Sequence, residues 1–460
     1  MKKLLLSILF LTALSIQAQN FWTEYATGQP ITPTSVRSIS IVDQNIAWLN
    51  IGPASPTQAQ NLLRSYSKTT NGGTVWTNGS IDLGPNSMNY GIANIHGISS
   101  SVAYAAVFPL MNTPGGIWKT EDGGTTWTKQ NTAYFSNQAS FVSMVYFWNT
   151  NDGVALGDPV NGYFEIYTTA DGGNIWTRLA STAAITPINS QEYLLLNKFA
   201  VKNNTIWAGT TFGRLLKSSD KGLTWTVSQS PIPDFGGMIN GEKAGNLAFT
   251  DVLNGLLQTS DNRLYKTIDG GITWTEIFYT GYLRNFDIAA VPGMPNAYVT
   301  VGNENFPVVN ERGSSYSIDG GYTWTSINNN PDINFVNGGI IEMFDVDHGF
   351  AGGFNTSSTV GGVFKWGGGS MLRQANLSVS NFTHRKTISL SPNPTIGIIN
   401  ISGKGISQYE LCDVTGKKIT NEKFNPLDNM SLNIDFLASG IYLLRVTNQD
   451  GVSSHKLIKQ

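Results

Sequence analysis

Thr120-Glu121-Asp122-Gly123-Gly124-Thr125-Thr126-Trp127 is an eight-residue motif that occurs six times in this chain, with small variations. The other copies keep a first Ser or Thr, an Asp or Asn, a glycine and a final Trp: residues 69–76, 169–176, 218–225, 267–274 and 317–324. Successive motif tryptophans lie 49 to 51 residues apart. A unit repeated at a fixed period of this length is typical of a repeat architecture, in which each unit packs on its neighbours.

Each repeat carries the same four short apolar segments. In residues 141–178, segments at 141–147, 154–156 and 164–167 precede the motif, and a fourth begins at its terminal Trp-Thr. Gly, Asn and Asp turns separate the segments, and no segment shows the 3.6-residue apolar period of a helix. Four short strands per repeat predict one blade of a β-propeller.

The motif has the chemistry of a tight turn between two strands. Its Asp carboxylate can accept hydrogen bonds from the backbone N–H groups that follow it. Its glycines can adopt positive φ, and its Trp offers a large apolar face to the neighbouring repeat. Asn71 replaces Asp in the first copy and keeps the acceptor, whereas Lys221 replaces the first Gly in the fourth copy. We therefore expect the motif to build the fold rather than to carry a reaction.

The six copies resemble the Asp-box, or BNR repeat, of sialidases and related β-propellers. The resemblance implies that each motif lies on the turn between the third and the outermost strand, away from the central binding face. The motif residues with a structural role are then Asn71, Trp76, Asp122, Trp127, Asp171, Trp176, Asp220, Trp225, Asp269, Trp274, Asp319 and Trp324.

Both ends of the repeat region predict a seventh blade. Residues 21–25 resemble the strand after each motif, and Trp22 lies 54 residues before Trp76. Segments 339–346, 349–354 and 361–365 resemble a first, second and third strand, but no motif follows them. An N-terminal strand that completes this blade leaves no free sheet edge. The predicted fold is all-β, with a seven-bladed β-propeller over residues 20–366 closed by the N-terminal strand.

The composition changes after Trp366. Residues 367–386 begin Gly-Gly-Gly-Ser and continue with polar residues, which predicts a linker. Residues 387–460 alternate short apolar segments with turn signals, as a small β-sandwich does.

The last residues resemble the type A sorting domain of the Bacteroidetes type IX secretion system. The matching segments are SPNPT at 391–395, the D-x-x-G-K turn at 413–417, SGIYLLRV at 439–446 and KLIK at 456–459. The resemblance implies that residues 387–460 engage the type IX secretion machinery. It also implies that the protein is secreted or displayed at the outer-membrane cell surface.

Residues 1–19 have the pattern of a secretory signal peptide. Lys2 and Lys3 precede an apolar run that ends at Leu14, and Ala18 supplies a small residue for cleavage. No later segment holds the roughly 18 uninterrupted apolar residues of a transmembrane helix. We therefore expect export through the periplasm and no membrane span in the mature chain.

The composition argues against several partners and cofactors. A net charge of −2 without long runs of one sign gives no footprint for nucleic acid. Cys412 is the only cysteine, so neither an intrachain disulfide nor a Cys-based metal site is expected. No cluster of His, Cys and carboxylate residues has the spacing of metal ligands. We expect no metal and no cofactor.

The sequence indicates no catalytic residue. Sialidases place their first arginine in an Arg-Ile-Pro segment, whereas Arg37 lies in Ser-Val-Arg-Ser-Ile. The two histidines of the repeat region, His96 and His348, are each isolated, and a lone histidine is more often structural than catalytic. Residues 152–164 contain an Asp-Pro pair in an expected loop, and they resemble the photosystem II assembly-factor-like propellers. In those proteins the ring is a binding platform.

The leading hypothesis is an exported, non-enzymatic binding or scaffold propeller with a protein or glycan ligand at its central funnel. The alternative is an extracellular glycan-active enzyme, either a glycoside hydrolase or a polysaccharide lyase. An enzyme requires at least two convergent acid and base groups in the funnel. The residues predicted to lie at the funnel and bind the ligand are Arg37, Asn94, Trp148, Asp158, Asn197, Lys198, Arg284 and Asn285.

Overall fold

The computed structural model describes residues 21–54, 64–85, 87–111, 113–135, 140–237, 244–302, 313–327, 339–377, 388–414, 417–448 and 451–460. The chain divides into two compact units, residues 1–376 and 377–460. Regular structure in the described residues is β-strand except for α1 (Gly369–Leu377) and a short 3₁₀ turn (Ser87–Asn89). The prediction of an all-β protein is confirmed. The expected signal peptide, residues 1–19, lies outside the described residues.

Four sheets of the first unit are antiparallel and four-stranded, and each keeps its strands in chain order. The first two contain β6 (Tyr90–Gly97), β7 (Ala103–Pro109), β8 (Gly116–Thr120) and β9 (Thr128–Lys129), then β10 (Val142–Phe147), β11 (Gly153–Val160), β12 (Tyr163–Thr169) and β13 (Thr177–Arg178). The next two contain β14 (Leu194–Lys202), β15 (Thr205–Thr210), β16 (Arg214–Ser218) and β17 (Thr226–Gln229), then β18 (Gly245–Phe249), β19 (Gly255–Thr259), β20 (Leu264–Thr267) and β21 (Thr275–Glu276). In each sheet the eight-residue motif joins the third strand to the fourth, as the sequence predicts.

Two larger sheets complete the first unit. One is five-stranded and contains β22 (Thr280–Gly281), β23 (Asp287–Ala290), β24 (Tyr298–Val301), β25 (Ser314–Ser317) and β26 (Thr323–Ser326). The other is eight-stranded and has the order β1-β29-β28-β2-β3-β4-β5, with β27 also paired to β28. Its strands are β1 (Trp22–Ala26), β2 (Thr34–Ile41), β3 (Ala47–Pro53), β4 (Ser65–Thr69), β5 (Thr77–Ser80), β27 (Ile341–Met343), β28 (Gly349–Ser357) and β29 (Val360–Trp366). The first strand of the chain is therefore hydrogen-bonded to the last strand of the unit.

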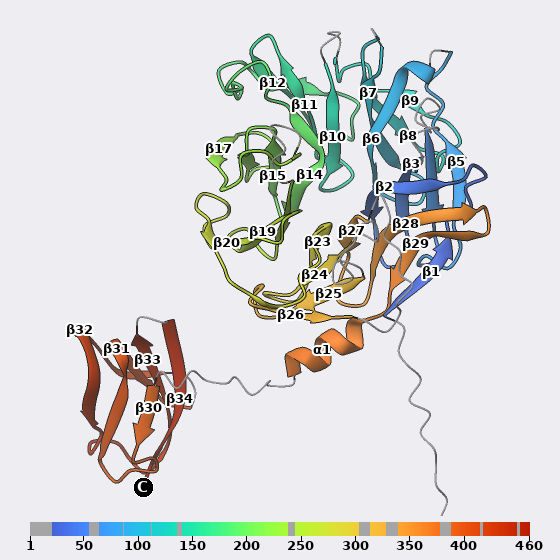
Figure 1. Ribbon diagram of the computed structural model, residues 1–460. Helices are drawn as coiled ribbons and strands as arrows, with labels where there is room; N and C mark the ends of the chain where they lie inside the picture. Colours follow the sequence, from blue (N-terminus) through green and yellow to red (C-terminus); the bar gives the residue numbers. More distant parts are fainter. Residues whose placement is uncertain are drawn as a thin grey trace, which may run out of the picture. The chain divides into compact units, whose positions relative to one another are not determined.

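Seven inner strands of the first unit contact one another in a circuit. β2 contacts β6, and contacts continue through β10, β14, β18, β23 and β27, which contacts β2 again. Figure 1 shows these strands around a common centre, with the later strands of each sheet farther out. Because successive side chains of a strand point to opposite faces, each sheet packs both faces against its neighbours.

The six motif turns share one local hydrogen-bond pattern, which the second copy illustrates. The Asp122 Oδ1 atom accepts the Thr126 N–H at 2.9 Å and the Thr120 hydroxyl at 2.9 Å. The Thr120 Oγ1 atom in turn accepts the Gly124 N–H at 2.8 Å. Gly123 and Gly124 adopt φ of 76° and 96°, which favours glycine. Hydrogen bonds from the Thr126 hydroxyl and amide lower the pKa of Asp122 to about 2.

The fourth motif turn departs from this pattern in one residue. Lys221 adopts φ of 61° at the position where the other copies have glycine. Its Nζ atom lies 2.5 Å from the Asp152 Oδ2 atom, which belongs to the β10–β11 turn. The ion pair crosses from one sheet to the next, so this turn is held by a side-chain contact that the glycines of the other copies cannot make.

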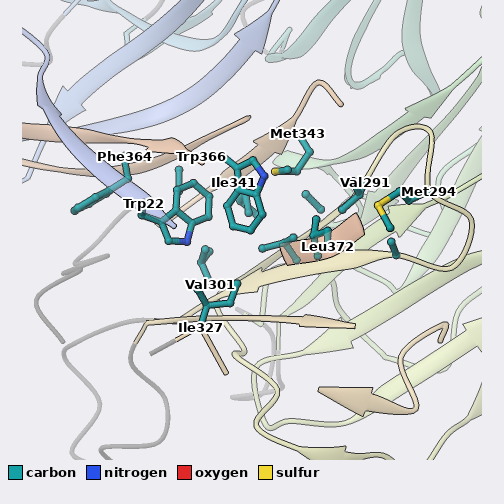
Figure 2. Close-up of a cluster of buried hydrophobic side chains, with 14 residues drawn as sticks. Trp22, Val291, Met294, Val301, Ile327, Ile341, Met343, Phe364, Trp366 and Leu372 are labelled. Carbon is teal, nitrogen blue, oxygen red and sulfur yellow. The ribbon is translucent and has the colours of Figure 1, made fainter. Parts of the chain in front are cut away.

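A buried cluster joins the two ends of the first unit (Figure 2). Trp22 pairs with Trp366 across β1 and β29, and the two ring centroids lie 4.9 Å apart at 65°. The Trp22 Nε1 atom donates to the Ser314 hydroxyl at 2.9 Å. Both indoles are 1% exposed. The first strand is therefore part of the core of this unit.

Residues 369–377 differ from the expected linker because they form α1. Leu372 is fully buried in the cluster around Trp22, and Met371 packs against the same cluster. Arg373 makes two hydrogen bonds to the Asp347 carboxylate, at 2.7 and 2.8 Å. Within this mostly polar segment, Met371 and Leu372 are apolar, and their packing against the core of the first unit stabilises the helix. Residues 378–386 of the predicted linker lie outside the described residues.

The second unit is one five-stranded sheet, where two separate sheets were expected. Its strands are β30 (Ile388–Ser391), β31 (Ile398–Cys412), β32 (Lys418–Asn433), β33 (Gly440–Asn448) and β34 (Gly451–Lys459). β31 is 15 residues long and pairs with β30 in its first half and with β33 in its second half. This long strand joins the pairings of β30 and β33 into one sheet. Cys412 is buried and has a free thiol.

Candidate functional site

The inner strands of the first unit enclose a central cavity of about 250 Å³. Residues from β2, β6, β10, β14, β18, β23 and β27 line it. Each of the seven strands contributes at least one polar residue to the lining, and apolar residues lie between them. We use "central cavity" for this space throughout.

A lysine, an asparagine and an aspartate form a polar group at the central cavity. The Lys198 Nζ atom donates to the Asn246 Oδ1 atom at 2.5 Å, and Asn246 donates to the Phe286 carbonyl at 2.7 Å. The Asp287 Oδ2 atom accepts the Ile341 N–H at 3.0 Å. Burial raises the pKa of Asp287 to about 6, although the charge of Lys198 acts in the opposite direction. These bonds link β14, β18, β23 and β27.

Glu342 is the second carboxylate of the central cavity. It lies on β27 between the buried Ile341 and Met343, and its own side chain is open to the cavity. Enclosure by the surrounding strands, together with the charge of Asp287, raises the pKa of Glu342 to about 7. Among the described residues, no hydrogen bond or ion pair reaches its carboxylate.

His96 and Tyr146 form the aromatic side of the central cavity. Their ring centroids lie 4.3 Å apart. The His96 Nε2 atom lies 3.0 Å from the Phe147 carbonyl, so Nε2 carries the proton and donates. Burial lowers the pKa of His96 to about 4, so the ring is neutral near pH 7. Burial and the charge of Glu342 raise the pKa of Tyr146 to about 12.

Two of the predicted ligand-binding residues line the central cavity. Asn94 exchanges two hydrogen bonds with the backbone of Val145, both at 2.9 Å, and so ties β6 to β10. Asn197 adopts φ of 58°, and its side-chain amide donates to the Arg37 carbonyl at 2.5 Å. This bond joins β14 to β2. Arg37 and Lys198 are thus in contact with lining residues but do not line the cavity themselves.

Asp158 and Trp148, two more of the predicted ligand-binding residues, lie outside the central cavity and contact other parts of the fold. Asp158 lies in a bulge of β11 rather than in the expected loop, and its Oδ1 atom accepts the Leu194 N–H at 3.0 Å. Burial raises the pKa of Asp158 to about 7. Trp148 is half-buried beside Tyr146.

Arg284 and Asn285 also lie outside the central cavity. Arg284 is 3% exposed and donates to the Ser326 hydroxyl at 2.9 Å. Asn285 is buried and donates to the Ser260 carbonyl at 2.9 Å. Both side chains are therefore engaged within the protein.

Asp287, Glu342, Tyr146 and Asn246 line the central cavity but were missed from the sequence. One signal was available for Glu342, which is a charged residue within a short apolar strand. A carboxylate at such a position either has a buried partner or faces a cavity. Asp287 begins a strand, so the same signal was weaker there.

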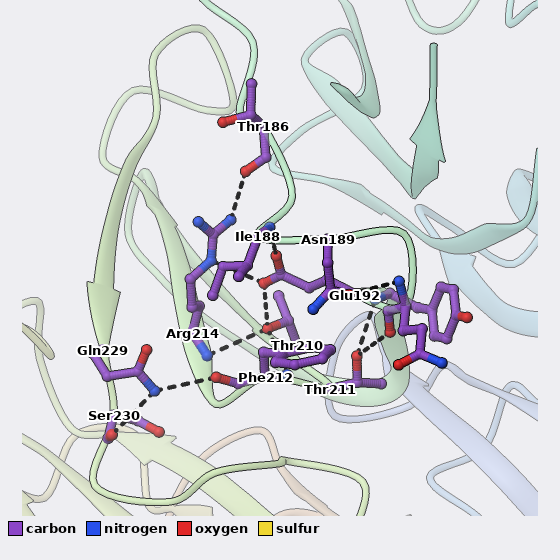
Figure 3. Close-up of polar contacts among 12 residues, drawn as sticks. Thr186, Ile188, Asn189, Glu192, Thr210, Thr211, Phe212, Arg214, Gln229 and Ser230 are labelled. Carbon is purple, nitrogen blue, oxygen red and sulfur yellow. Dashed lines mark hydrogen bonds and ion pairs between the residues drawn. The ribbon is translucent and has the colours of Figure 1, made fainter. Parts of the chain in front are cut away.

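A buried ion pair supports the loop that leads into β14 (Figure 3). Glu192 is fully buried, and its Oε1 atom accepts from the Arg214 Nε atom at 2.9 Å and from the Thr210 hydroxyl at 2.8 Å. Its Oε2 atom accepts the Ile188 N–H at 2.6 Å. Arg214 also donates to the Thr186 carbonyl at 2.9 Å. The network fixes the entry to the strand that carries Asn197 and Lys198.

Residues 389–460 match the family described as the secretion system C-terminal sorting domain. A type IX sorting tail of this kind points to secretion or to attachment at the cell surface. In the described part of the chain, no helix has the length and apolar character needed to cross a bilayer. The same residues contain no group of three or more His, Cys, Asp or Glu side chains that would hold a metal ion.

Comparison with solved structures shows a propeller-like fold. YCF48 bound to D1 peptide and YCF48 from Cyanidioschyzon merolae are each 17% identical to this chain, with TM-scores of 0.51. The alignments cover 76% of this chain and 97% and 99% of those chains. A Hadza microbial sialidase is 13% identical over 74% of this chain and 66% of its own, with a TM-score of 0.37. No curated protein matches the sequence. The tail and the fold together fit a secreted propeller of the Bacteroidetes kind.

Proposed function

We propose that this protein is an exported, non-enzymatic binding propeller whose ligand docks at the central cavity. Its ring would have seven blades, with the eight-stranded sheet counting as two. The pairing of Trp22 with Trp366 supports closure by the N-terminal strand, and the circuit of inner-strand contacts supports the count. The six motif turns would be Asp-boxes with a structural role, because the hydrogen bonds of their Asp or Asn side chains stay within each turn.

The observation that carries the binding function is a carboxylate that lines the central cavity and has no partner among the described residues. Pockets that bind ligands are largely apolar, with a few polar groups that fix orientation. The lining of the central cavity is richer in polar residues, and among them the Glu342 carboxylate makes no hydrogen bond or ion pair with the described residues. A solved propeller of similar fold carries a bound peptide, and we extend that mode of use to this chain.

The size of the central cavity favours a binder over an enzyme that acts on glycan chains. Its volume of about 250 Å³ lies below the roughly 300–1,000 Å³ of typical ligand pockets. A hydrolase must hold sugar units on both sides of the scissile bond. A single side chain or end group of a partner fits such a volume better.

Retention on the immobilised full chain tests this function. A panel of peptides and glycans is applied, and mass spectrometry follows both the retained molecules and any products. We expect retention without cleavage, and we expect it to be lost in Tyr146→Leu. Tyr322→Leu is the matched control, because Tyr322 lies in a motif turn and is 45% exposed. Retention of nothing, or equal retention by both variants, contradicts binding at the cavity.

A glycan-active enzyme is the second candidate, and two observations favour it. Asp287 and Glu342 are neighbouring carboxylates with raised pKa values, and the rings of His96 and Tyr146 are in contact at the same cavity. Glycoside hydrolases use paired carboxylates, and perturbed pKa values cluster at catalytic sites. Release of shortened glycans by the parent chain, abolished in Asp287→Asn, would establish the enzyme and refute the binder.

Export through the type IX route rests on residues 387–460, preceded by periplasmic entry through residues 1–19. We expect a chain that lacks residues 389–460 to accumulate in the periplasm of a type IX host. The full chain should reach the surface or the medium. Cell fractionation with an antibody to the first unit distinguishes the two locations. Equal export of both chains would contradict the sorting role.

A further inference from the structure

We propose that the central cavity receives an ammonium or guanidinium group on an aliphatic stem, as presented by a lysine or arginine side chain of a partner. This inference rests on the proposed binding function and names the chemistry of its ligand. The argument uses the charges, walls and volume of the cavity.

Glu342 is the one charge at the central cavity that the described residues leave unbalanced. Lys198 is bound to Asn246 and is drawn electrostatically to Asp287 and Asp234. Lys202 is attracted to Asp251, whose pKa it helps to lower. His96 is neutral near pH 7.

Because its side chain is exposed within the cavity, Glu342 is solvated in the free protein, and a ligand that covers the carboxylate must replace that water with a paired charge or a proton. A cation placed beside Glu342 would supply the missing pair. An anionic ligand would instead face two carboxylates, and a wholly apolar one would leave Glu342 unpaired.

The walls of the central cavity suit a stem as well as a charge. Its lining includes the apolar residues Ile39, Phe199, Leu247 and Ala289, which come from four different strands. The ring of Tyr146 lies on the same wall and close enough to Glu342 to feel its charge. Aromatic faces attract ammonium and guanidinium groups, with a gain of about 0.5–2 kcal/mol. A chain of methylene groups that ends in a cation meets all three features.

The volume limits the ligand to one such group. About 250 Å³ accommodates a long side chain but is small for a compact drug-sized molecule. A partner protein would therefore insert a single residue, and the remainder of the contact would lie outside the cavity. A free aliphatic amine has the same chemistry and is distinguished by experiment.

The binding should depend on pH in a defined direction. Glu342 is coupled electrostatically to Asp287 on β23 and Tyr146 on β10, and His96 on β6 and Lys202 on β14 line the same cavity. Its pKa of about 7 in the free protein means that about half of the molecules carry a protonated Glu342 near pH 7. A cation binds the ionised form, so affinity should rise between about pH 6 and 8.

Titration of the full chain with short peptides tests the proposal. The peptides are acetylated, amidated glycine pentamers whose central residue is Lys, Arg, norleucine or Glu, and n-butylammonium represents a free amine. Calorimetry should detect saturable binding for Lys or Arg and none for norleucine or Glu. Saturation by n-butylammonium alone would support the same cavity chemistry with a small amine as its source.

Glu342→Gln should lower the affinity for the cationic ligand about tenfold or more and remove the pH dependence of binding. The matched control is Glu121→Gln, because Glu121 lies in a motif turn with its side chain 72% exposed. It should change neither affinity nor pH profile. Thermal unfolding confirms that both variants fold. Binding that is unchanged in Glu342→Gln, or equal binding of norleucine and Lys, would overturn the proposal.

The two proposals fail in different ways. If the cationic probes do not bind but the panel yields another ligand that Tyr146→Leu releases, the cavity is a binding site for different chemistry. In that case only the present inference is lost. If neither the probes nor the panel bind, the proposed binding function itself fails.

Discussion

Replacing Trp22 with Ala should destabilise the first unit by about 3–5 kcal/mol, the usual cost of emptying a buried Trp site. Trp22 is 1% exposed, and a fully buried indole removes roughly 150–250 Å² of surface from water. At about 25 cal/mol per Å² this burial corresponds to about 4–6 kcal/mol as an upper bound. The variant also loses the edge-to-face contact with Trp366 and the hydrogen bond to Ser314.

Two matched variants separate these contributions. Trp22→Phe keeps an aromatic ring but removes the Nε1 donor, so we expect a loss of about 1–2 kcal/mol. Trp274→Ala removes a motif tryptophan that is only partly buried, and its cost should be smaller than that of Trp22→Ala.

Urea unfolding followed by circular dichroism gives the three free energies. Sedimentation velocity shows whether a weakened β1 exposes the edge of β29 and promotes association. A loss below about 1 kcal/mol for Trp22→Ala in a monomeric protein would refute the view that β1 belongs to the cooperative core.

Three further predictions concern charged side chains of the first unit. Asp122→Ala removes the acceptor of three hydrogen bonds and should lower the urea midpoint. Because the pKa of Asp122 is lowered to about 2, its stabilisation is present above about pH 4 and lost toward pH 2. A difference in urea midpoint between parent and variant that persists at pH 2 contradicts the reasoning. Arg214→Met should cost about 3–5 kcal/mol by leaving the buried Glu192 without its ion-pair partner. Adding Glu192→Gln should recover part of that loss in urea unfolding, and strict additivity would argue against the pair. Asp158 has its pKa raised to about 7, so the native state retains a proton and the parent should lose stability as pH rises from about 4 to 7. Asp158→Asn should flatten that decline, and its free energy of unfolding should exceed that of the parent by about 1 kcal/mol or more at pH 8. Parallel pH profiles of the two proteins would count against this prediction.

Much of the first unit was predictable because its turns are built from residues close in the sequence. The Thr120 and Asp122 side chains bond to groups within four residues of themselves, and the same pattern recurs in the other motif turns. The strand after each motif could be placed for the same reason. The pairing of Trp22 with Trp366 also had a sequence signal, since residues 21–25 resemble the strand that follows each motif.

The prediction was less complete where contacts join distant segments. Residues 369–377 have a polar composition, and only burial of Leu372 among residues far away in sequence explains their helix. Asp158 was expected in a loop, but the bulge of β11 and the amide of Leu194 hold it within the sheet. Arg284 was expected at the funnel, but a hydrogen bond to Ser326 engages its guanidinium elsewhere.

The sequence by itself determined the repeat, the chemistry of its turns and the sorting tail, because each depends on neighbouring residues or on a short pattern within one segment. Only the tertiary structure decided what the centre of the first unit contains. Glu342 meets Asp287 from a strand 55 residues away, and Asn197 reaches Arg37 across 160 residues. Such meetings depend on how the inner strands follow one another around the cavity, and that geometry exists only after the sheets have packed.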